Sequence, residues 1–173
     1  MNAVAAEISM ARTRWLPAYV SLGSNLADPA AQVRRALQAL GRQPGIRLVV
    51  SSPLYWTKPF GAVVQPAFVN AVAGLLIQSS PEDFLTTLRA LETELGREPA
   101  RERWGPRLID LDLLAVGCET RDTAALTLPH PGIAERDFVL YPLADIAPDL
   151  DVPGLGRVAE LRARVANRGI TRL

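Results

Sequence analysis

The sequence predicts an α+β fold in which a ferredoxin-like core, ordered βαββαβ, forms an antiparallel sheet. The first observation is a set of short apolar runs, each bounded by glycine, proline or a polar turn. The second is a pair of amphipathic stretches that begin with a capping residue and a proline and end at a glycine. The third is their order along the chain. The helices of the core should share one face of the sheet, and a C-terminal extension should complete α/β/α layers.

The first strand and the first helix occupy residues 18 to 41. The apolar run 18–22 predicts a strand, and the Gly23-Ser24-Asn25 segment after it predicts a turn. Asp28 is a typical N-cap residue, and Pro29 suits the first helical position. The helix ends at Gly41, and its apolar positions recur at helical spacing: Val33, Ala36, Leu37 and Leu40.

Two further strands follow the first helix. A β-branched run at 46–52 predicts the second strand, which ends at Pro53. Residues 57–66 contain two prolines and a glycine, a composition typical of a loop. The apolar run 68–77 then predicts the third strand.

The second helix and the fourth strand complete the core. Ser80 caps the helix and Pro81 occupies its first turn. The charged stretch 97–106 predicts a loop, and 108–116 predicts the fourth strand. The helix ends at Gly96, and its apolar positions are Phe84, Leu88, Leu91 and Leu95.

The residues after the fourth strand contain many prolines and one amphipathic stretch near 158–166, which predicts a short helix. Because no linker separates them from the core, we expect them to pack on it. The prediction is therefore one domain over residues 16–173, preceded by a flexible extension over residues 1–15. The prolines of this region are Pro129, Pro131, Pro142, Pro148 and Pro153.

Composition excludes several classes of protein. Lys and Arg total 19 against 18 for Asp and Glu, unlike the strongly basic footprint of a non-specific nucleic-acid binder. The single cysteine excludes an internal disulfide framework and a cysteine-rich zinc site, and the single histidine excludes a two-histidine metal site. Apolar stretches such as 69–77 are far too short to cross a bilayer. We expect a cytoplasmic protein with no nucleic-acid or membrane partner.

The near-neutral total hides a concentration of charge in residues 89–112. This segment holds 11 charged residues in 24, whereas charged residues make up 21% of the chain. A solvated helix end and loop is the ordinary interpretation of such a run, but the order of the residues here favours a site. The charged side chains are Arg89, Glu92, Glu94, Arg97, Glu98, Arg101, Glu102, Arg103, Arg107, Asp110 and Asp112.

Two aspartates in the fourth strand predict a metal site. Strand alternation points Asp110 and Asp112 to one face, with Cα atoms roughly 7 Å apart, and sends Ile109, Leu111 and Leu113 into the core. Adjacent carboxylates are unfavourable unless a cation lies between them, and aspartate disfavours strands. Hard carboxylate oxygens suit Mg²⁺, which typically also binds substrate phosphates. The alternative is a surface pair bridged by neighbouring arginines.

Arginines beside the aspartates extend this prediction to a metal–polyphosphate site. A guanidinium binds phosphate bidentately and stays charged. The sequence lacks the G-x-x-x-x-G-K-[ST] motif of a P-loop, and Lys58, the only lysine, lies outside any such context. The protein-kinase motifs are absent as well. The arginines close enough in sequence to converge on one anion are Arg97, Arg101, Arg103 and Arg107.

Three other side chains allow either a structural or a functional role. Trp104 is either a packing anchor of its loop or a cover over a flat ligand. His130, held between prolines, is either structural or a hydrogen-bond donor to a phosphate or base. Asn70 either caps a strand end or pairs with a heteroaromatic edge, while Phe68 and Phe138 suit the core on composition alone.

The segment Arg103-Trp-Gly-Pro-Arg-Leu-Ile-Asp-Leu-Asp112 resembles the R-W-G-P-R-x-x-D-L-D motif of the 6-hydroxymethyl-7,8-dihydropterin pyrophosphokinases. This motif is highly specific, and shorter matches follow in the order typical of the family between residue 18 and about 150. They are Leu22-Gly-Ser-Asn25, Phe60-Gly61, Gln65-Pro66, Phe68-Val-Asn70, Glu92, Gly96-Arg97, Leu126-Thr-Leu-Pro-His130 and Arg136-Asp-Phe138.

The resemblance implies transfer of pyrophosphate from ATP, the co-substrate, to the hydroxymethyl group of 6-hydroxymethyl-7,8-dihydropterin, giving AMP, in tetrahydrofolate biosynthesis. It implies two Mg²⁺ ions held by Asp110 and Asp112 and activation of the pterin hydroxyl for in-line attack on the β-phosphorus. Arg97 and Arg107 would stabilise charge on the transferring group. Such chemistry depends on positioning and electrostatics.

The same resemblance implies the residues of two binding sites. The pterin would stack between Phe68 and Phe138, with Asn70 at its edge. The full pterin set is Thr57, Phe60, Gly61, Phe68, Asn70 and Phe138. The full nucleotide set is Glu92, Arg97, Arg103, Trp104, Arg107, Leu113, Thr127, His130 and Arg136.

Three positions depart from patterns seen in some members of the family. Pro99 stands where some members carry a second loop arginine, and Arg101 is the nearest substitute. Pro131 follows the histidine where tyrosine is common, and Ala125 stands where some members have arginine. The polar loop 97–104 is expected to act as a lid over ATP.

Two other functions remain as alternatives to the enzyme. A ferredoxin-like regulatory module would bind a nucleotide without catalysis, but it would not need paired aspartates. An RNA-binding α/β domain would need basic and aromatic surfaces, whereas the net charge is +1 and aromatic residues make up 6%. We expect a monomer.

Overall fold

Six antiparallel strands form the central sheet of the computed structural model, which describes residues 14–59, 64–97 and 105–173. Two long neighbours, β1 (Leu16–Ser24) and β4 (Phe68–Ile77), form its centre and pair along their whole lengths. Beside β1 lies β5 (Asp110–Val116). On the other side, β4 pairs with β2 (Ile46–Ser51) near one end and with β3 (Tyr55–Thr57) near the other, and β10 (Thr171–Arg172) extends the sheet from β3. The predicted antiparallel βαββαβ core is confirmed.

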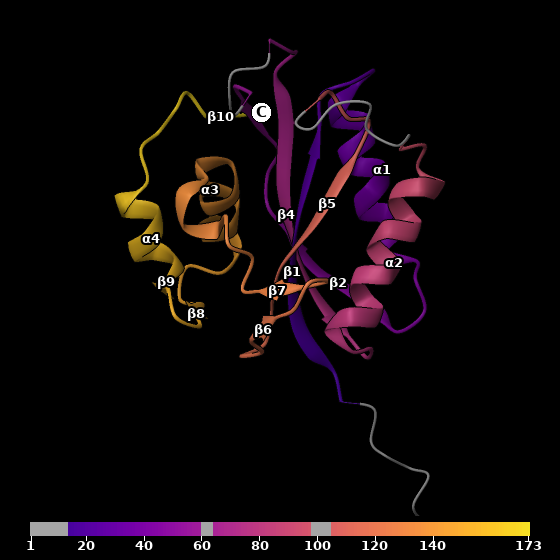
Figure 1. Cartoon of the computed structure of the whole chain (residues 1–173). Coiled ribbons are helices and arrows are strands. Elements are labelled where there is room, and N and C mark those ends of the chain that lie inside the picture. Colours follow the sequence, from indigo (N-terminus) through magenta and orange to yellow (C-terminus); the bar gives the residue numbers. More distant parts are fainter. Residues whose placement is uncertain (1–13, 60–63, 98–104) are drawn as a thin grey trace, which may run out of the picture.

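The two predicted core helices are α1 (Pro29–Gly41) and α2 (Pro81–Glu94), and both cover one face of the sheet (Figure 1). Both begin at the predicted caps. Asp28 Oδ1 accepts the Ala31 N–H at 3.0 Å, and Ser80 Oγ accepts the Asp83 N–H at 3.1 Å. The apolar stripes of the helices and the facing side chains of β1, β4 and β5 form the main core. Within the described residues, no helix is long and apolar enough to span a membrane.

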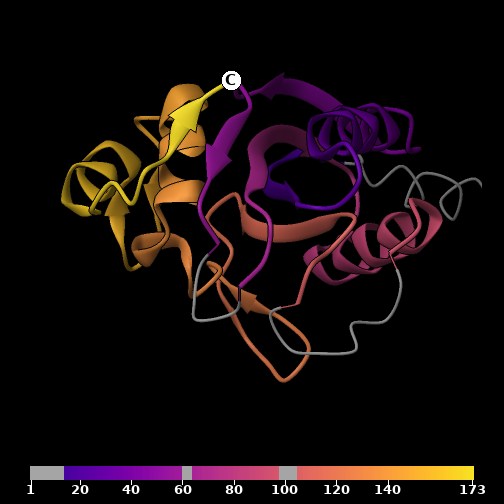
Figure 2. The same cartoon turned by 90° about the horizontal axis from the view of Figure 1, so that it is seen from above.

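The C-terminal extension covers the opposite face of the sheet with α3 (Asp137–Ile146) and α4 (Val158–Arg164), preceded by the 3₁₀ turn η1 (Ile133–Glu135) (Figures 1 and 2). The α/β/α layering is therefore as expected. The helix at Asp137–Ile146 was not predicted, because Pro142 lies inside it and interrupts the backbone hydrogen bonding. Its apolar side chains pack with Val72 and Leu114 in a second core cluster, which compensates for that loss.

Several short strands were not predicted from the sequence. Strand β3 lies where a loop was expected to begin, and β10 pairs with it from the end of the chain. Two small hairpins lie in the extension, formed by β6 (Arg121–Asp122) with β7 (Thr127–Leu128) and by β8 (Asp151–Val152) with β9 (Gly156–Arg157). Runs of two or three residues are too short to show periodicity, so sequence alone gives no signal for them.

The register of the sheet brings distant residues side by side. Gly23 of β1 lies opposite Asn70 of β4 on one side and opposite Asp110 of β5 on the other. Ser21, two residues earlier, lies opposite Asp112. Because alternate residues share a face, all these side chains lie on the face that α3 covers, away from the main core. A polar row therefore crosses three strands at one end of the sheet.

Candidate active site

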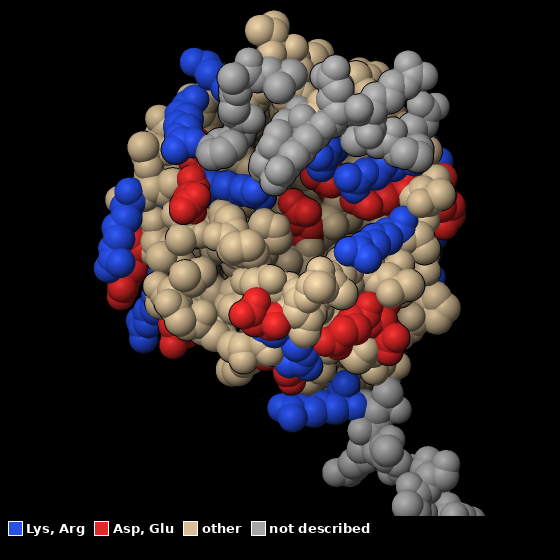
Figure 3. All heavy atoms as spheres, viewed as in Figure 1, with Lys and Arg blue, Asp and Glu red and all other residues tan. Residues whose placement is uncertain are grey.

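A cavity of about 310 Å³ lies over this polar row, between the sheet and the start of α3. In the space-filling view, acidic side chains lie among basic ones beside a hollow on the face that Figure 3 shows. The residues that line the cavity are Ser21, Gly23, Thr57, Lys58, Gln65, Phe68, Asn70, Gly105, Arg107, Asp110, Asp112, His130, Arg136 and Phe138.

One end of the cavity is formed by Gly23, Asn70 and Thr57. The Asn70 amide Nδ2 donates to Thr57 Oγ1 at 2.6 Å, and both side chains are buried. A Cβ atom at Gly23 would lie only 2.8 Å from Asn70 Oδ1, so this position has no room for a side chain. The strand register thus places the buried Asn70 amide against the backbone of Gly23. The rings of Phe68 and Phe138 line the same cavity. An aromatic heterocycle with polar edges matches this chemistry.

The other end holds the two aspartates of β5. Asp110 and Asp112 both line the cavity, while Ile109, Leu111 and Leu113 between and beside them are buried in the core. This confirms the predicted alternation of the strand. Among residues 14–59, 64–97 and 105–173, no three His, Cys, Asp or Glu side chains cluster closely enough to hold a metal by themselves. Two carboxylates on one face still suit Mg²⁺, because phosphate oxygens and water usually supply its other ligands.

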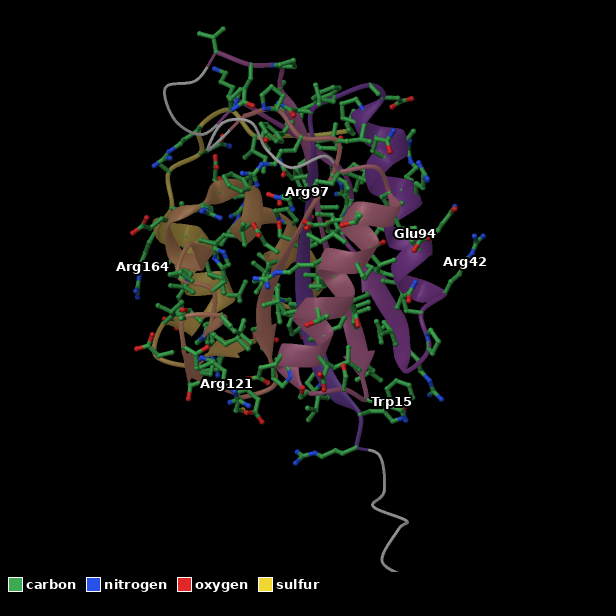
Figure 4. All side chains as sticks on the ribbon, turned by 45° about the vertical axis from the view of Figure 1, so that its right-hand side comes forward. Trp15, Arg42, Glu94, Arg97, Arg121 and Arg164 are labelled. Carbon is green, nitrogen blue, oxygen red and sulfur yellow. The ribbon has the colours of Figure 1, made fainter. Side chains whose placement is uncertain are left out.

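Three arginines surround these carboxylates. Arg97 Nη1 lies 2.9 Å from Asp110 Oδ1, and Arg107 Nη1 lies 2.8 Å from Asp110 Oδ2. Arg136 Nη1 lies 3.8 Å from Asp112 Oδ2. Arg97 also pairs with Glu92, near the end of α2. Figure 4 shows Arg97, three residues after α2, directed toward the interior, whereas Glu94, the last residue of α2, points outward. Positive charge is therefore held at the cavity by the same acids that a cation would bind.

The two acids beside Asp110 hold their protons unusually tightly. Burial, and then the charge of Asp110, raise the pKa of Asp112 to about 6. Burial raises the pKa of Glu92 to about 7, against the opposing effects of Arg97 and of the Leu111 N–H, which donates to Glu92 Oε1 at 2.7 Å. Ionised carboxylates are therefore disfavoured here unless another cation approaches, and a divalent ion would supply the missing charge.

The single histidine lies on the wall formed by the extension. The Gly132 N–H donates to His130 Nδ1 at 2.9 Å, so Nδ1 is the unprotonated nitrogen and Nε2 carries the hydrogen. Burial, and then the charge of Arg136, lower the pKa of His130. A Cβ atom at Gly132 would lie 2.6 Å from Arg136 Nε, so the glycine makes room for that guanidinium. His130 and Arg136 thus present a neutral donor and a cation on one wall.

Asn25 connects the two ends of the cavity, a role that the sequence analysis missed. Its buried amide Nδ2 donates to Gln65 Oε1 at 3.0 Å and to the Pro66 carbonyl at 3.2 Å. Its Oδ1 accepts the Arg107 N–H at 2.8 Å, and its own N–H donates to the Arg107 carbonyl at 3.1 Å. Its place after a strand predicts a turn, and its place in the family match Leu22-Gly-Ser-Asn25 gives it no role, so neither signal predicts a contact with residue 107.

Comparison with known proteins identifies the family of the chain. Residues 19–148 match the model of a family described as 7,8-dihydro-6-hydroxymethylpterin-pyrophosphokinase. The chain belongs to this family. A relative named 2-amino-4-hydroxy-6-hydroxymethyldihydropteridine pyrophosphokinase, from Pseudomonas aeruginosa, is 49% identical over 156 residues, which are 90% of this chain and 95% of that protein. The relative of the same name from Haemophilus influenzae is 40% identical over 158 residues, which are 91% and 98% of the two chains.

The fold is also that of a solved pyrophosphokinase structure. A structure described as Plasmodium falciparum HPPK-DHPS with pteroate superposes with a TM-score of 0.70 at 14% identity over 87% of this chain. The match covers 42% of that longer chain, and at this low identity it supports only the fold of the matched residues.

Most side chains predicted from the pyrophosphokinase resemblance meet at the cavity. Arg97 lies beside the cavity because it contacts Asp110, and Glu92 lies next to it because it pairs with Arg97. Leu113 is buried in the main core, and Thr127 is exposed on β7, so neither lines the cavity. Phe60, Gly61, Arg103, Trp104 and the greater part of the expected lid lie outside the described residues. The predicted residues that line the cavity are Thr57, Phe68, Asn70, Arg107, Asp110, Asp112, His130, Arg136 and Phe138.

Proposed function

We propose that this cavity is where the chain carries out the reaction of its family. The family reaction transfers pyrophosphate from ATP to the hydroxymethyl group of 6-hydroxymethyl-7,8-dihydropterin and belongs to folate biosynthesis, so the chain is an ATP-dependent diphosphotransferase. In the transfer, a bond forms between the hydroxymethyl oxygen and the β-phosphorus, the bond between β-phosphorus and the α,β-bridging oxygen breaks, and AMP leaves. The observation that supports this location is the row Asn70–Gly23–Asp110, which joins an aromatic pocket to an acidic cluster.

The charged end of the cavity holds the phosphates in this proposal. Asp110 and Asp112 would hold two Mg²⁺ ions, whose charge would neutralise the triphosphate and favour the deprotonated form of the attacking hydroxyl. Arg97 and Arg107 lie within 3 Å of Asp110 and can turn from this carboxylate to the transferring group. Their charge stabilises the in-line transition state, which needs positioning and electrostatics more than covalent catalysis.

The aromatic end holds the pterin. Phe68 and Phe138 stack on the two faces of the ring, and Asn70 with Thr57 reads its polar edge. The buried Asn70–Thr57 hydrogen bond fixes the amide before the ligand arrives, which reduces the entropy lost on binding. Phe60 and Gly61 complete this pocket in the proposal.

The nucleotide extends along the wall of the extension. His130 donates from Nε2 to a phosphate or to the base, because its Nδ1 is occupied by the Gly132 N–H. Arg136 supplies a cation beside it. Glu92, Arg103, Trp104, Leu113 and Thr127 belong to the same proposed nucleotide site.

An assay of AMP formation tests the proposal. Purified protein with ATP and Mg²⁺ should release AMP only when the reduced pterin is present, and EDTA should abolish the release. Nucleotide binding without AMP under these conditions would support a non-catalytic regulatory module and would overturn the enzyme.

A matched pair of arginine variants tests the location of the site. Arg107 pairs with Asp110 at the cavity. Arg121 does not line the cavity and forms ion pairs with Glu82, at 2.8 Å, and with Glu119, at 2.7 Å. Arg107→Gln should lower turnover about 100- to 1,000-fold, and Arg121→Gln should leave it unchanged. Equal effects of the two changes would argue against the assigned site.

The remaining assignments are also proposals. We infer that residues 16–173 form one domain, that the protein is a monomer, and that it works in the cytoplasm. Sedimentation equilibrium across a range of concentrations tests the monomer, with a constant mass expected. A mass that rises to twice that of the chain would contradict it.

A further inference from the structure

The last residues of the chain connect two opposite walls of the cavity. We call residues 165–173 the C-terminal segment. It leaves α4 at Val165, and its strand β10 lies against β3, as the yellow end of the chain in Figure 2 shows. Thr171 pairs with Trp56, Arg172 pairs with Tyr55, and the Leu173 N–H donates to the Leu54 carbonyl at 2.9 Å. The residue after Trp56 is Thr57, on the cavity wall.

Asp137 holds the other end of this segment. It is the first residue of α3, only 5% of it is exposed, and it immediately precedes Phe138. Its Oδ1 accepts the Phe138 N–H at 2.9 Å, and its Oδ2 accepts the Arg168 N–H at 2.8 Å. Hydrogen bonds to an ionised carboxylate are among the stronger ones in proteins. One buried carboxylate therefore binds both the backbone of the cavity wall and the backbone of the C-terminal segment.

A tight turn keeps the C-terminal segment in register between these two attachments. Asn167 Oδ1 accepts the Gly169 N–H at 2.8 Å and the Ile170 N–H at 3.1 Å. Gly169 has a φ of +94°, which favours glycine, and the Lys58 side chain lies over it, 3.2 Å from where its Cβ would stand. Ile170 is buried, so the turn delivers an apolar anchor to the sheet.

These contacts form one continuous path from Phe138 to Thr57, across the width of the proposed pterin pocket. The path is separate from the contacts that hold α3 on the sheet. Tyr55 donates to Asp145 Oδ2 at 2.5 Å near the other end of α3, and the apolar side of the helix packs on Val72 and Leu114. The C-terminal segment also lies beyond residues 19–148, which match the family model.

We propose that Asp137 is a positioning residue, which acts through the C-terminal segment to set the spacing between Phe138 and the β3 wall and thereby the affinity for the pterin. The inference rests on the proposed function, because it assigns the pterin to this pocket. The two hydrogen bonds of the Asp137 carboxylate predict a selective effect. Loosening the C-terminal segment weakens pterin binding, while Arg97 and Arg107 keep their contacts with Asp110 on β5.

Two pairs of variants in the full-length chain test this inference. Asp137→Asn is isosteric but can accept only one of the two N–H groups, and Asp149→Asn, at an exposed position, makes the same change of charge. Asn167→Ala removes the acceptor of the turn, whereas Asn167→Asp keeps it. Calorimetry gives the Kd of the reduced pterin with a non-hydrolysable ATP analogue and Mg²⁺ present, and the Kd of the analogue alone.

Asp137→Asn and Asn167→Ala should each raise the pterin Kd about five- to tenfold, with the analogue Kd unchanged. Asp149→Asn and Asn167→Asp should bind like the wild type. An unchanged pterin Kd in Asp137→Asn, or an equal loss for both ligands, would overturn the positioning role. If the wild type binds ATP but no pterin, the proposed function itself fails, and the two failures are therefore distinct.

Discussion

Asp112→Asn should make the metal-free protein more stable and nearly inactive at the same time. Burial, and then the charge of Asp110, raise the pKa of Asp112 to about 6, so its ionised form is unfavourable in the folded chain at neutral pH. Asparagine has the same shape and no charge. The substitution removes this penalty together with a proposed Mg²⁺ ligand.

The size and the sign of the effect follow from the two pKa values. The pKa of an unperturbed aspartate is 3.8, so the folded state binds the Asp112 proton more tightly than the unfolded state does. The folded protein therefore becomes less stable as the pH rises from about 4 through about 6. Two pKa units would correspond to about 3 kcal/mol. The side chain is 39% exposed, however, and water screens part of this energy, so we expect a gain of about 1 kcal/mol in the variant.

Urea denaturation in EDTA measures the gain. The variant should be more stable than the wild type at about pH 7.5. The difference should shrink as the pH falls through about 6 to values below 3.8, where Asp112 is protonated in both the folded and the unfolded state. Turnover with Mg²⁺ should fall by at least about a hundredfold. Leu111→Ala on the opposite face of β5 is the control: it is 4% exposed, so its loss should cost about 2–5 kcal/mol with turnover per folded molecule retained. A less stable Asp112→Asn at neutral pH would refute the reasoning about this half-buried anion, and normal turnover would refute the metal assignment.

Three further predictions concern the walls of the cavity. His130 is the only imidazole, so NMR can follow its titration without assignment; its pKa should lie below the ordinary value of about 6.5, with the hydrogen on Nε2. The stability that neutral His130 contributes is present above pH 6.5 and is lost as the pH falls through the lowered pKa. A measured pKa above 6.5 would contradict its burial. Gly23→Ala places a Cβ 2.8 Å from Asn70 Oδ1 and should raise the pterin Kd about tenfold without changing ATP-analogue binding, so equal losses for both ligands in calorimetry would count against the pocket. Asn25→Ala leaves the polar partners at Gln65, Pro66 and Arg107 without their hydrogen bonds and should lower the free energy of unfolding by about 1–3 kcal/mol in urea titrations, whereas an unchanged midpoint would show that these bonds are not important for stability.

The parts of the fold that sequence predicts are those with local causes. Asp28 and Ser80 cap their helices through bonds to residues three positions away, so the signal and the structure lie in the same short segment. The alternation of β5 is equally local, because burial of Leu111 forces Asp110 and Asp112 onto the other face. The acidic pair of the candidate site could therefore be recognised from the order of its residues alone.

The parts that sequence did not predict depend on distant partners. Strand β10 exists because β3 lies beside it, and the two are more than a hundred residues apart in the chain. The helix α3 forms despite Pro142 because its apolar side packs on the sheet, which outweighs the lost backbone bond. Asn25 contacts Gln65 and Arg107, which lie 40 and 82 residues away from it along the chain. The Asp137 link to Arg168 has the same origin.

A crystal structure of the full chain with Mn²⁺ in place of Mg²⁺, a non-hydrolysable ATP analogue and the reduced pterin tests the central claim most directly. The account predicts anomalous density for metal bound to both Asp110 and Asp112, with the pterin ring between Phe68 and Phe138 and its edge at Asn70. Metal bound away from the two aspartates, or a pterin outside the cavity, would contradict it.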